Sequence, residues 1–173
     1  YEPSLHNEAM ELAQRIPVLW SGVEQTLSTD LDDRLQITIL NNAGRVAEAT
    51  DMPHWVAGVA HPSTGEIMIA RHGPQGAPTN LDALLKHEMA HVALERATAG
   101  ADVPRWFHEG IAESFEENVD IARAQTLAGL VFGRGVPDLD SLEASFHGED
   151  GIDAGAAYAA ARDLVNFLRY RDG

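Results

Sequence analysis

Cysteine, positive charge and long apolar runs are scarce in this sequence, and each lack excludes a class of structure or partner. Without cysteine the chain forms neither disulfide bonds nor thiolate metal sites, so histidine and carboxylate side chains remain as the strong ligands for a transition metal. Lys and Arg number 12 against 27 Asp and Glu, a formal net charge of −15, and such a surface repels polyanions, so nucleic acid is not expected as a partner. No apolar run approaches the roughly 18 residues that a membrane-spanning helix requires, so we expect no membrane span.

The length and the composition are those of one globular domain. The chain has 173 residues, of which 45% are hydrophobic and 23% are charged, and a chain of this size can bury a core without cross-links. We therefore expect a single domain over 1–173, with a helix and a sheet in 1–79 and a helical part in 80–173. Because the chain begins at Tyr1 with neither a Met nor a basic, apolar leader, we expect a processed chain, for which an exported or cell-envelope location is favoured over a cytoplasmic one.

The hydrophobic pattern predicts an α+β fold. Apolar residues spaced by three and four predict a helix over 5–27 that Pro17 either kinks or divides into two shorter helices. Alternating segments rich in branched residues predict strands over 34–40, 54–60 and 66–70, and the last two should form a hairpin because a tight turn separates them. The later segments have helical spacing, with helices expected over about 81–98, 106–115, 119–131 and 154–170 and a loop over 133–151.

The segment HEMAH, residues 87–91, carries the pattern of a zinc site. On a helix, side chains four residues apart lie on the same face, so His87 and His91 can both present a ring nitrogen to one metal ion. Glu88 flanks the same point and can accept a proton from a zinc-bound water, whose pKa the metal lowers to about 7. The sequence therefore predicts two ligands and a general base, with one Zn²⁺ per chain.

The third ligand distinguishes the zinc families that share this motif. In the metzincin pattern a glycine and a histidine follow three and six residues after the second histidine, but Leu94 and Ala97 occupy those positions here. The gluzincin pattern takes a glutamate from a following helix, and Glu109 lies in a predicted helix 18 residues after the second histidine. Glu113 follows one turn later on the same face, so we expect it to hold the free ring nitrogen of a ligand histidine, with His87 as its partner.

These motifs resemble those of a gluzincin zinc metallopeptidase, and in particular the small peptidase MA-like domains of bacteria. The resemblance covers nearly everything after Arg34, in the segments PHWVAGVA, GEIMIA, LLKHEMAHVAL, PRWFHEGIAE and GAAYAAARDLVNFLRYRDG. It implies a zincin-like fold, in which a small mixed twisted sheet packs on the HExxH helix and a mainly helical C-terminal half follows. It also implies hydrolysis of peptide bonds, with a peptide or protein substrate bound in extended form along the strand 66–70.

The resemblance further implies a residue that stabilises the oxyanion of the tetrahedral intermediate. Gluzincin aminopeptidases have a tyrosine at the start of a similarly placed helix, and the matching residue is Tyr158, although Ala160 and Ala161 replace the Lys and Gly of the family's YxKG context. Thermolysin-like enzymes use a histidine for this task, so His147 and His108 remain alternatives. The GxMEN motif of the aminopeptidases is absent, so we do not expect removal of N-terminal residues.

A binding or scaffold module of the same fold is the alternative function. Such a module would keep the fold and the metal site but have little or no peptidase activity, and Tyr158 would then be a packing residue. Arg71 and His72, which follow the strand 66–70, are further candidates for the lining of a cleft, on position alone.

Overall fold

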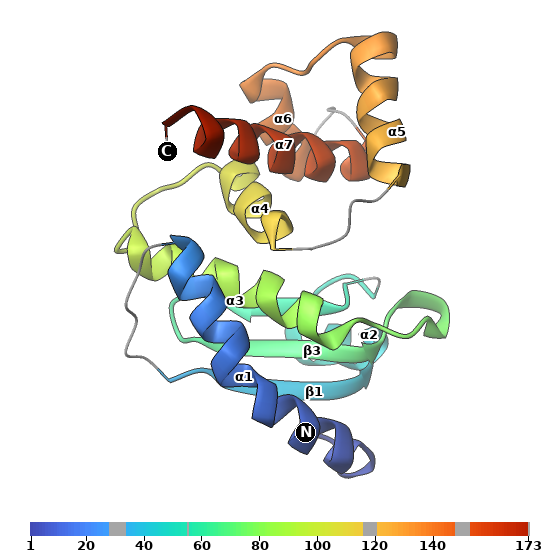
Figure 1. The fold of residues 1–173 in the computed structure, drawn as a ribbon. Coiled ribbons are helices and arrows are strands. Elements are labelled where there is room, and N and C mark those ends of the chain that lie inside the picture. The colour runs from blue at the N-terminus through green and yellow to red at the C-terminus, as the bar shows by residue number, and fades with distance from the viewer. Residues whose placement is uncertain (28–33, 55, 116–120, 148–152, 173) are drawn as a thin grey trace. The chain divides into compact units, whose positions relative to one another are not determined.

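The computed structural model describes all residues except 28–33, 55, 116–120, 148–152 and 173 (Figure 1). The described residues form two compact units, Tyr1–Ala101 and Asp102–Gly173. The first unit combines helices with a three-stranded sheet and the second consists of helices, which confirms the predicted α+β class with a mainly helical C-terminal half. That the two units act as one domain stays a prediction. No helix of the described residues is long and apolar enough to cross a membrane.

The helix α1 (His6–Leu27) opens the first unit after a 3-10 turn over Pro3–Leu5. It is one helix of 22 residues with Pro17 inside it, which excludes the alternative of two shorter helices. Pro17 lies on the exposed side, where water can replace the hydrogen bond that proline removes. The opposite side carries Leu12 and Val23, which are 1% and 0% exposed, so α1 packs through this apolar stripe.

The strands β1 (Gln36–Asn42), β2 (Gly58–His61) and β3 (Glu66–His72) form a mixed sheet in the order β1-β3-β2. β1 runs parallel to β3. β2 and β3 form the predicted antiparallel hairpin, and the turn between them ends at Gly65, whose φ of +74° explains the glycine. The prediction of a small mixed sheet is therefore confirmed.

The central position of β3 contradicts one prediction. The sequence predicts the strand 66–70 as the one that binds an extended substrate by adding it as a further strand. In the structure β1 pairs with one side of β3 and β2 with the other, so the backbone groups of this strand are hydrogen-bonded on both sides. The prediction is wrong for this strand, because strand addition needs an unpaired edge. Among the described residues β1 and β2 are the two edge strands. The N-terminal segment lies against β1, where the N–H of Glu2 donates to the carbonyl of Ile39 at 3.3 Å, whereas no described strand pairs with the outer side of β2.

Helices cover both faces of the sheet. In Figure 1, α1 and α3 (Leu81–Ala97) lie on the same side of it. Gly58 of β2 is opposite Ile69 of β3, and a Cβ at Gly58 would point at side chains of α3, so Ile69 faces α3 as well. The helix α2 (Ala43–Thr50) packs on the other face, through a cluster of Ala43, Val46 and Ala70 with Leu40, Ala57 and Val59 around it.

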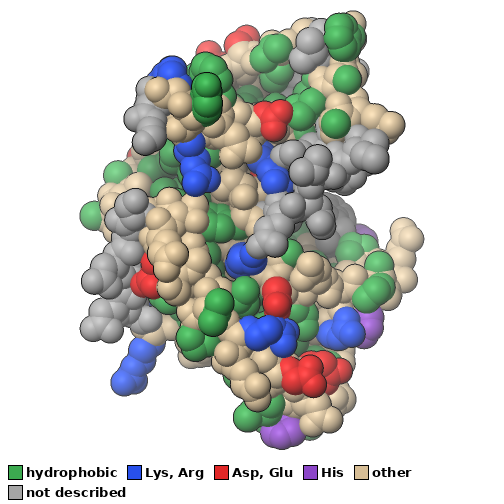
Figure 2. All heavy atoms as spheres, viewed as in Figure 1, with side chains coloured by type: hydrophobic (Ala, Val, Ile, Leu, Met, Phe, Trp, Pro, Cys, Tyr) green, Lys and Arg blue, Asp and Glu red, His purple; other side chains and the backbone are tan. Residues whose placement is uncertain are grey.

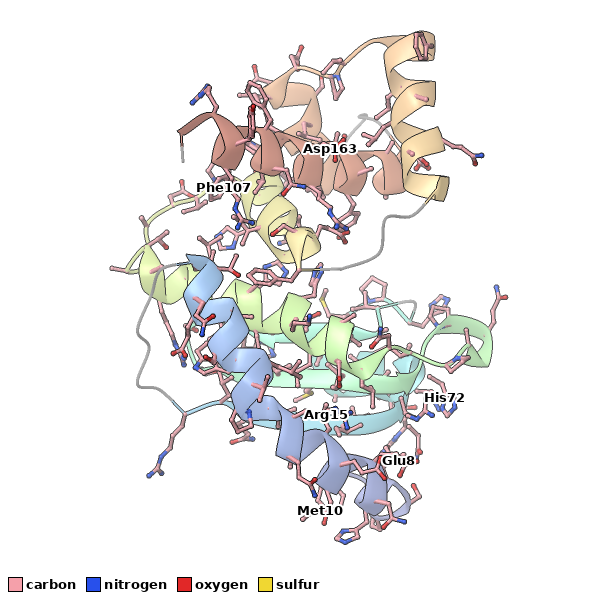
Figure 3. The ribbon with its side chains drawn as sticks, in the orientation of Figure 1. Glu8, Met10, Arg15, His72, Phe107 and Asp163 are labelled. Atoms are coloured by element: carbon pink, nitrogen blue, oxygen red, sulfur yellow. The ribbon has the colours of Figure 1, made fainter. Side chains whose placement is uncertain are left out.

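The predicted helix around HEMAH is α3, and polar contacts fix its beginning. The side chain of Asn80 accepts a hydrogen bond from the N–H of Ala83 at 3.2 Å and so caps the helix. Asp82 in the first turn binds Arg15 of α1, with 2.9 Å between Nη2 and Oδ1, and Figure 3 shows Arg15 on that helix. In Figure 2 acidic and basic side chains lie next to one another in the region of α1. The buried side of α3 carries Leu85, Met89, Ala90 and Val92, each 0% exposed.

The second unit contains α4 (Arg105–Ser114), α5 (Ile121–Gly129), a π-helical turn (Leu130–Arg134), α6 (Leu139–Phe146) and α7 (Ala154–Asp172). The predicted loop over 133–151 is wrong in part, because α6 lies within it. Asp138 caps α6 by accepting the N–H of Ser141 at 2.7 Å, and Leu142 on the inner side is 2% exposed. A capping residue followed by apolar residues at helical spacing was the sequence signal for this helix.

Gly110 lets α4 approach α7 closely. A Cβ at this position would lie 2.5 Å from the carbonyl oxygen of Ala161 and 2.7 Å from Val165 Cγ2, both on α7. Glycine inside a helix costs about 1 kcal/mol relative to alanine, and this close approach is the structural reason for it. The packing of these two helices therefore depends on the missing side chain.

Candidate metal centre

His87 and His91 lie one turn apart on α3. Their ring centroids are 5.0 Å apart with the ring planes at 74°, and each offers a ligand nitrogen within 4.8 Å of the other. Both side chains are half-buried, whereas Met89 and Ala90 between them are fully buried against the rest of the unit. The helix thus brings the two predicted histidine ligands together on one side and holds that side in place.

Glu88 is one of two buried charged residues in the described part of the chain, with 5% of its surface exposed. A Cβ at Gly58 would lie 2.5 Å from Glu88 Oε1, so the carboxylate lies directly over the first residue of β2. Burial of a carboxylate is costly unless hydrogen bonds, an opposite charge or a metal ion compensate for the lost hydration. Its position next to His87 in the same helix makes Glu88 the candidate general base.

Glu109 on α4 is the other buried charged residue among those described, with 3% of its surface exposed. Arg105, one turn earlier, donates Nε–H to Glu109 Oε1 at 2.9 Å, which neutralises part of the charge and fixes the direction of the carboxylate. Among the described residues, His87, His91 and Glu109 form a group that could hold a metal ion, in which each residue offers one ligand atom.

A glutamate from another helix caps the beginning of α4. Pro104, which precedes the helix, supplies no side-chain cap. Glu143 of α6 accepts the N–H of Arg105 at 2.9 Å through Oε1 and the N–H of Trp106 at 3.0 Å through Oε2, and Nε2 of His147 lies 3.1 Å from Oε1. Burial raises the pKa of Glu143, but the hydrogen bonds from the two backbone N–H groups and from His147 outweigh it, and the net pKa is lowered.

Glu143, which fixes the helix that carries Glu109, could not be recognised from the sequence. The capping carboxylate is 38 residues away from the first N–H group that it binds, so no local spacing links the two. The helix α6, from which it projects, was itself predicted as loop. No sequence signal at the beginning of α4 points to a capping partner.

The predicted roles of Glu113 and Tyr158 stay predictions. Glu113 is half-buried on α4, one turn after Glu109. Tyr158 is half-buried on α7, and its ring packs edge to face on that of Phe146 with the centroids 5.1 Å apart. This contact orients the phenol ring within the second unit.

The other histidine and arginine candidates occupy different surroundings. His108 is half-buried on α4, and His147 is exposed and bound to the cap of that helix. His72, labelled in Figure 3, lies at the end of β3, where Nδ1–H donates to the carbonyl oxygen of Asn41 at 3.0 Å. Arg71 lines a polar hollow at the beginning of α3, together with Glu8, Glu11, Arg15, Thr79 and Asp82. The residues that line this hollow include neither His87 nor His91.

The search for relatives adds no family to this description. No protein-family model matches the chain, and neither a curated protein nor a solved structure matches it. The candidate metal centre therefore depends on the chemistry and the geometry of its own residues.

Proposed function

We propose that the chain is a zinc-dependent metallopeptidase, in which His87, His91 and Glu109 hold one zinc ion and Glu88 is the general base. The observation that carries the proposal is the pair of histidines on one side of α3 with the buried carboxylate of Glu88 beside them. Two histidines one turn apart with a carboxylate in that position are the arrangement typical of zinc peptidases with an HExxH helix.

The donor set fits zinc. Catalytic zinc sites use three protein ligands, and two histidines with one glutamate are a common combination. Between α3 and α4 the linker 98–104 can span up to about 23 Å, whereas His91 is about 9 Å from the end of α3 and Glu109 about 6 Å from the beginning of α4. The chain is therefore long enough for Glu109 to reach the histidines. When bound, zinc supplies a Lewis acid and lowers the pKa of a water molecule to about 7.

Each residue around the zinc ion has its own role in peptide hydrolysis. Glu88 accepts the proton of the attacking water and delivers it to the amine leaving group. Arg105 keeps the Glu109 carboxylate in one orientation. Glu113 accepts a hydrogen bond from the ring N–H of His87 that does not face the zinc ion. Tyr158 donates a hydrogen bond to the oxyanion that develops in the transition state.

The proposed substrate is a peptide in extended form, and β2 is the strand that can receive it. The N–H of Ala70 donates to the carbonyl of Ala57 at 2.7 Å, so the carbonyl of Ala57 faces β3. Backbone groups alternate in direction along an antiparallel pair, so the N–H and C=O groups of Gly58 and Ala60 point to the edge that no described strand covers. A peptide that adds to this edge pairs with Gly58 next to Glu88.

The variant Glu88→Gln tests the proposal. Glutamine keeps the shape of the side chain but accepts no proton, so the zinc content should stay at one per chain while kcat on a peptide library falls by about 10²–10⁴. Glu95→Gln is the matched control, because Glu95 lies on the same helix after the second histidine and should leave both quantities unchanged. Cleavage by Glu88→Gln at the rate of the unmodified chain would show that Glu88 is not the base.

Zinc content and cleavage of the peptide library also distinguish the peptidase hypothesis from the alternative of a binding module. One zinc per chain without cleavage of any library peptide by the unmodified protein would support a binding or scaffold module. A chain that carries no metal after purification without chelators, and takes up none, would contradict both functions.

A further inference from the structure

We infer that Gly58 is a positioning residue for Glu88, since the lack of a side chain at this point of β2 is what lets the carboxylate lie over the strand. The inference rests on the proposed function, in which Glu88 is the base. A Cβ at Gly58 would lie 2.5 Å from Glu88 Oε1, 3.1 Å from Glu88 Cδ and 2.7 Å from Leu84 Cδ1. Real Cβ atoms essentially never come closer than 3.0 Å to a heavy atom to which they are not bonded. Any other residue at this position therefore displaces the carboxylate.

Space, and not backbone conformation, is the reason for glycine at this position. Gly65 and Gly100 have φ angles of +74° and +72°, a left-handed conformation that L residues rarely adopt. Gly58 is not among the glycines with positive φ, and its backbone belongs to a strand, which other residues adopt freely. Glycine weakens a strand because it has no side chain to pack and loses more conformational entropy. A strand glycine under the tip of a buried carboxylate therefore indicates that the close approach itself is needed.

The strand β3 and the helix α3, between which Gly58 lies, are both fixed by buried residues. A new side chain at position 58 therefore displaces the ends of the Glu88 and Leu84 side chains. Gly58 is paired with Ile69 of the central strand, and Ile69 is 0% exposed. On the other side α3 is held by buried residues such as Leu85. The three atoms nearest to a Cβ at Gly58 belong to Glu88 and Leu84 and none to a histidine. A side chain at position 58 should therefore move the base and leave the zinc ligands where they are.

The first experiment separates catalysis from metal binding in the full chain. In Gly58→Ala the zinc affinity, measured by titration with zinc alone, should equal that of the unmodified chain, whereas kcat on a cleaved peptide should fall by about tenfold to a hundredfold. Gly22→Ala is the matched control, because nothing lies within 4 Å of a Cβ at Gly22, and its kcat should not change. A Gly58→Ala variant with unchanged kcat overturns the inference, and so does an equal loss of zinc affinity and kcat.

The second experiment needs no enzymatic activity. As a single substitution, Gly58→Ala should lower the midpoint of thermal unfolding by up to a few degrees, because the new methyl group displaces the flexible end of the buried Glu88 side chain. In a Glu88→Ala background the same substitution should lower it much less, because the main overlap is gone and only the flexible end of Leu84 remains. Equal losses in the two backgrounds overturn the inference.

The two proposals fail in different ways. If the proposed function is wrong, the unmodified chain does not cleave peptides, while the coupling of Gly58 to Glu88 in thermal unfolding is still measured. If Gly58 does not position Glu88, the unmodified chain cleaves peptides, Glu88→Gln does not, and Gly58→Ala does.

Discussion

Glu143 should stabilise the second unit through the beginning of α4, and the variant Glu143→Gln tests this. The carboxylate accepts two backbone N–H groups that no residue of the helix can satisfy, at 2.9 and 3.0 Å. Glutamine has one acceptor oxygen, so it can satisfy one of the two and carries no charge for the positive end of the helix dipole. Loss of a capping interaction costs about 0.5–2 kcal/mol, and the ionised acceptor places this case in the upper half of that range, at about 1–2 kcal/mol.

Urea unfolding followed by the fluorescence of the three tryptophans, one of which is Trp106 on α4, measures this loss. Because the pKa of Glu143 is lowered in the folded chain, its stabilisation is complete above the unfolded pKa of about 4.3 and is lost as the pH falls through the folded pKa. The difference between the unmodified chain and Glu143→Gln should therefore shrink in acid. Asp140→Asn is the control, because Asp140 is an exposed carboxylate on α6. It should lose a few tenths of a kcal/mol of unfolding free energy at most. A loss below about 0.5 kcal/mol for Glu143→Gln, or one that does not change between pH 7 and acid, refutes the reasoning.

Two further predictions concern packing and metal binding. Gly110→Ala should lose up to about 2 kcal/mol of unfolding free energy in urea, since an overlap with the backbone of α7 costs about 1–3 kcal/mol and alanine returns only about 1 kcal/mol of helix propensity. Gly129→Ala, with nothing within 4 Å of a Cβ, should lose none, and equal effects at the two positions would contradict the close approach. Zinc at about 100 times its dissociation constant should raise the unfolding free energy by about 2.7 kcal/mol and a chelator should reverse this, as calorimetry can show. The same zinc effect in His91→Ala would exclude His91 as a ligand.

Features that depend on spacing within one helix could be predicted from the sequence. Side chains four residues apart share a face in any helix, so the meeting of His87 and His91 needed no knowledge of the rest of the fold. The capping residue Asn80 and the first-turn Asp82 lie next to the helix that they begin, and they were recognisable for the same reason.

Features that depend on partners far along the chain could not be predicted. The segments that form β1, β2 and β3 look alike as short apolar runs, and the order of the strands depends on pairs such as Gln36 with Glu66, 30 residues apart. The prediction that an extended substrate binds along 66–70, which the family resemblance implies, failed because a resemblance in short segments does not show which backbone groups are paired. Glu143 was missed for the same reason, since its capping bonds join two helices.

The short edge of β2 also bears on how the chain avoids aggregation. A strand with an uncovered edge can pair with another copy of the same chain as readily as with a substrate. β2 has only four residues, and the groups that point outward belong to two of them, Gly58 and Ala60, too few for a stable sheet between two copies. On the opposite edge the N-terminal segment lies against β1, where the N–H of Glu2 donates to the carbonyl of Ile39 at 3.3 Å. An edge with only two outward-facing residues therefore limits pairing between copies of the chain.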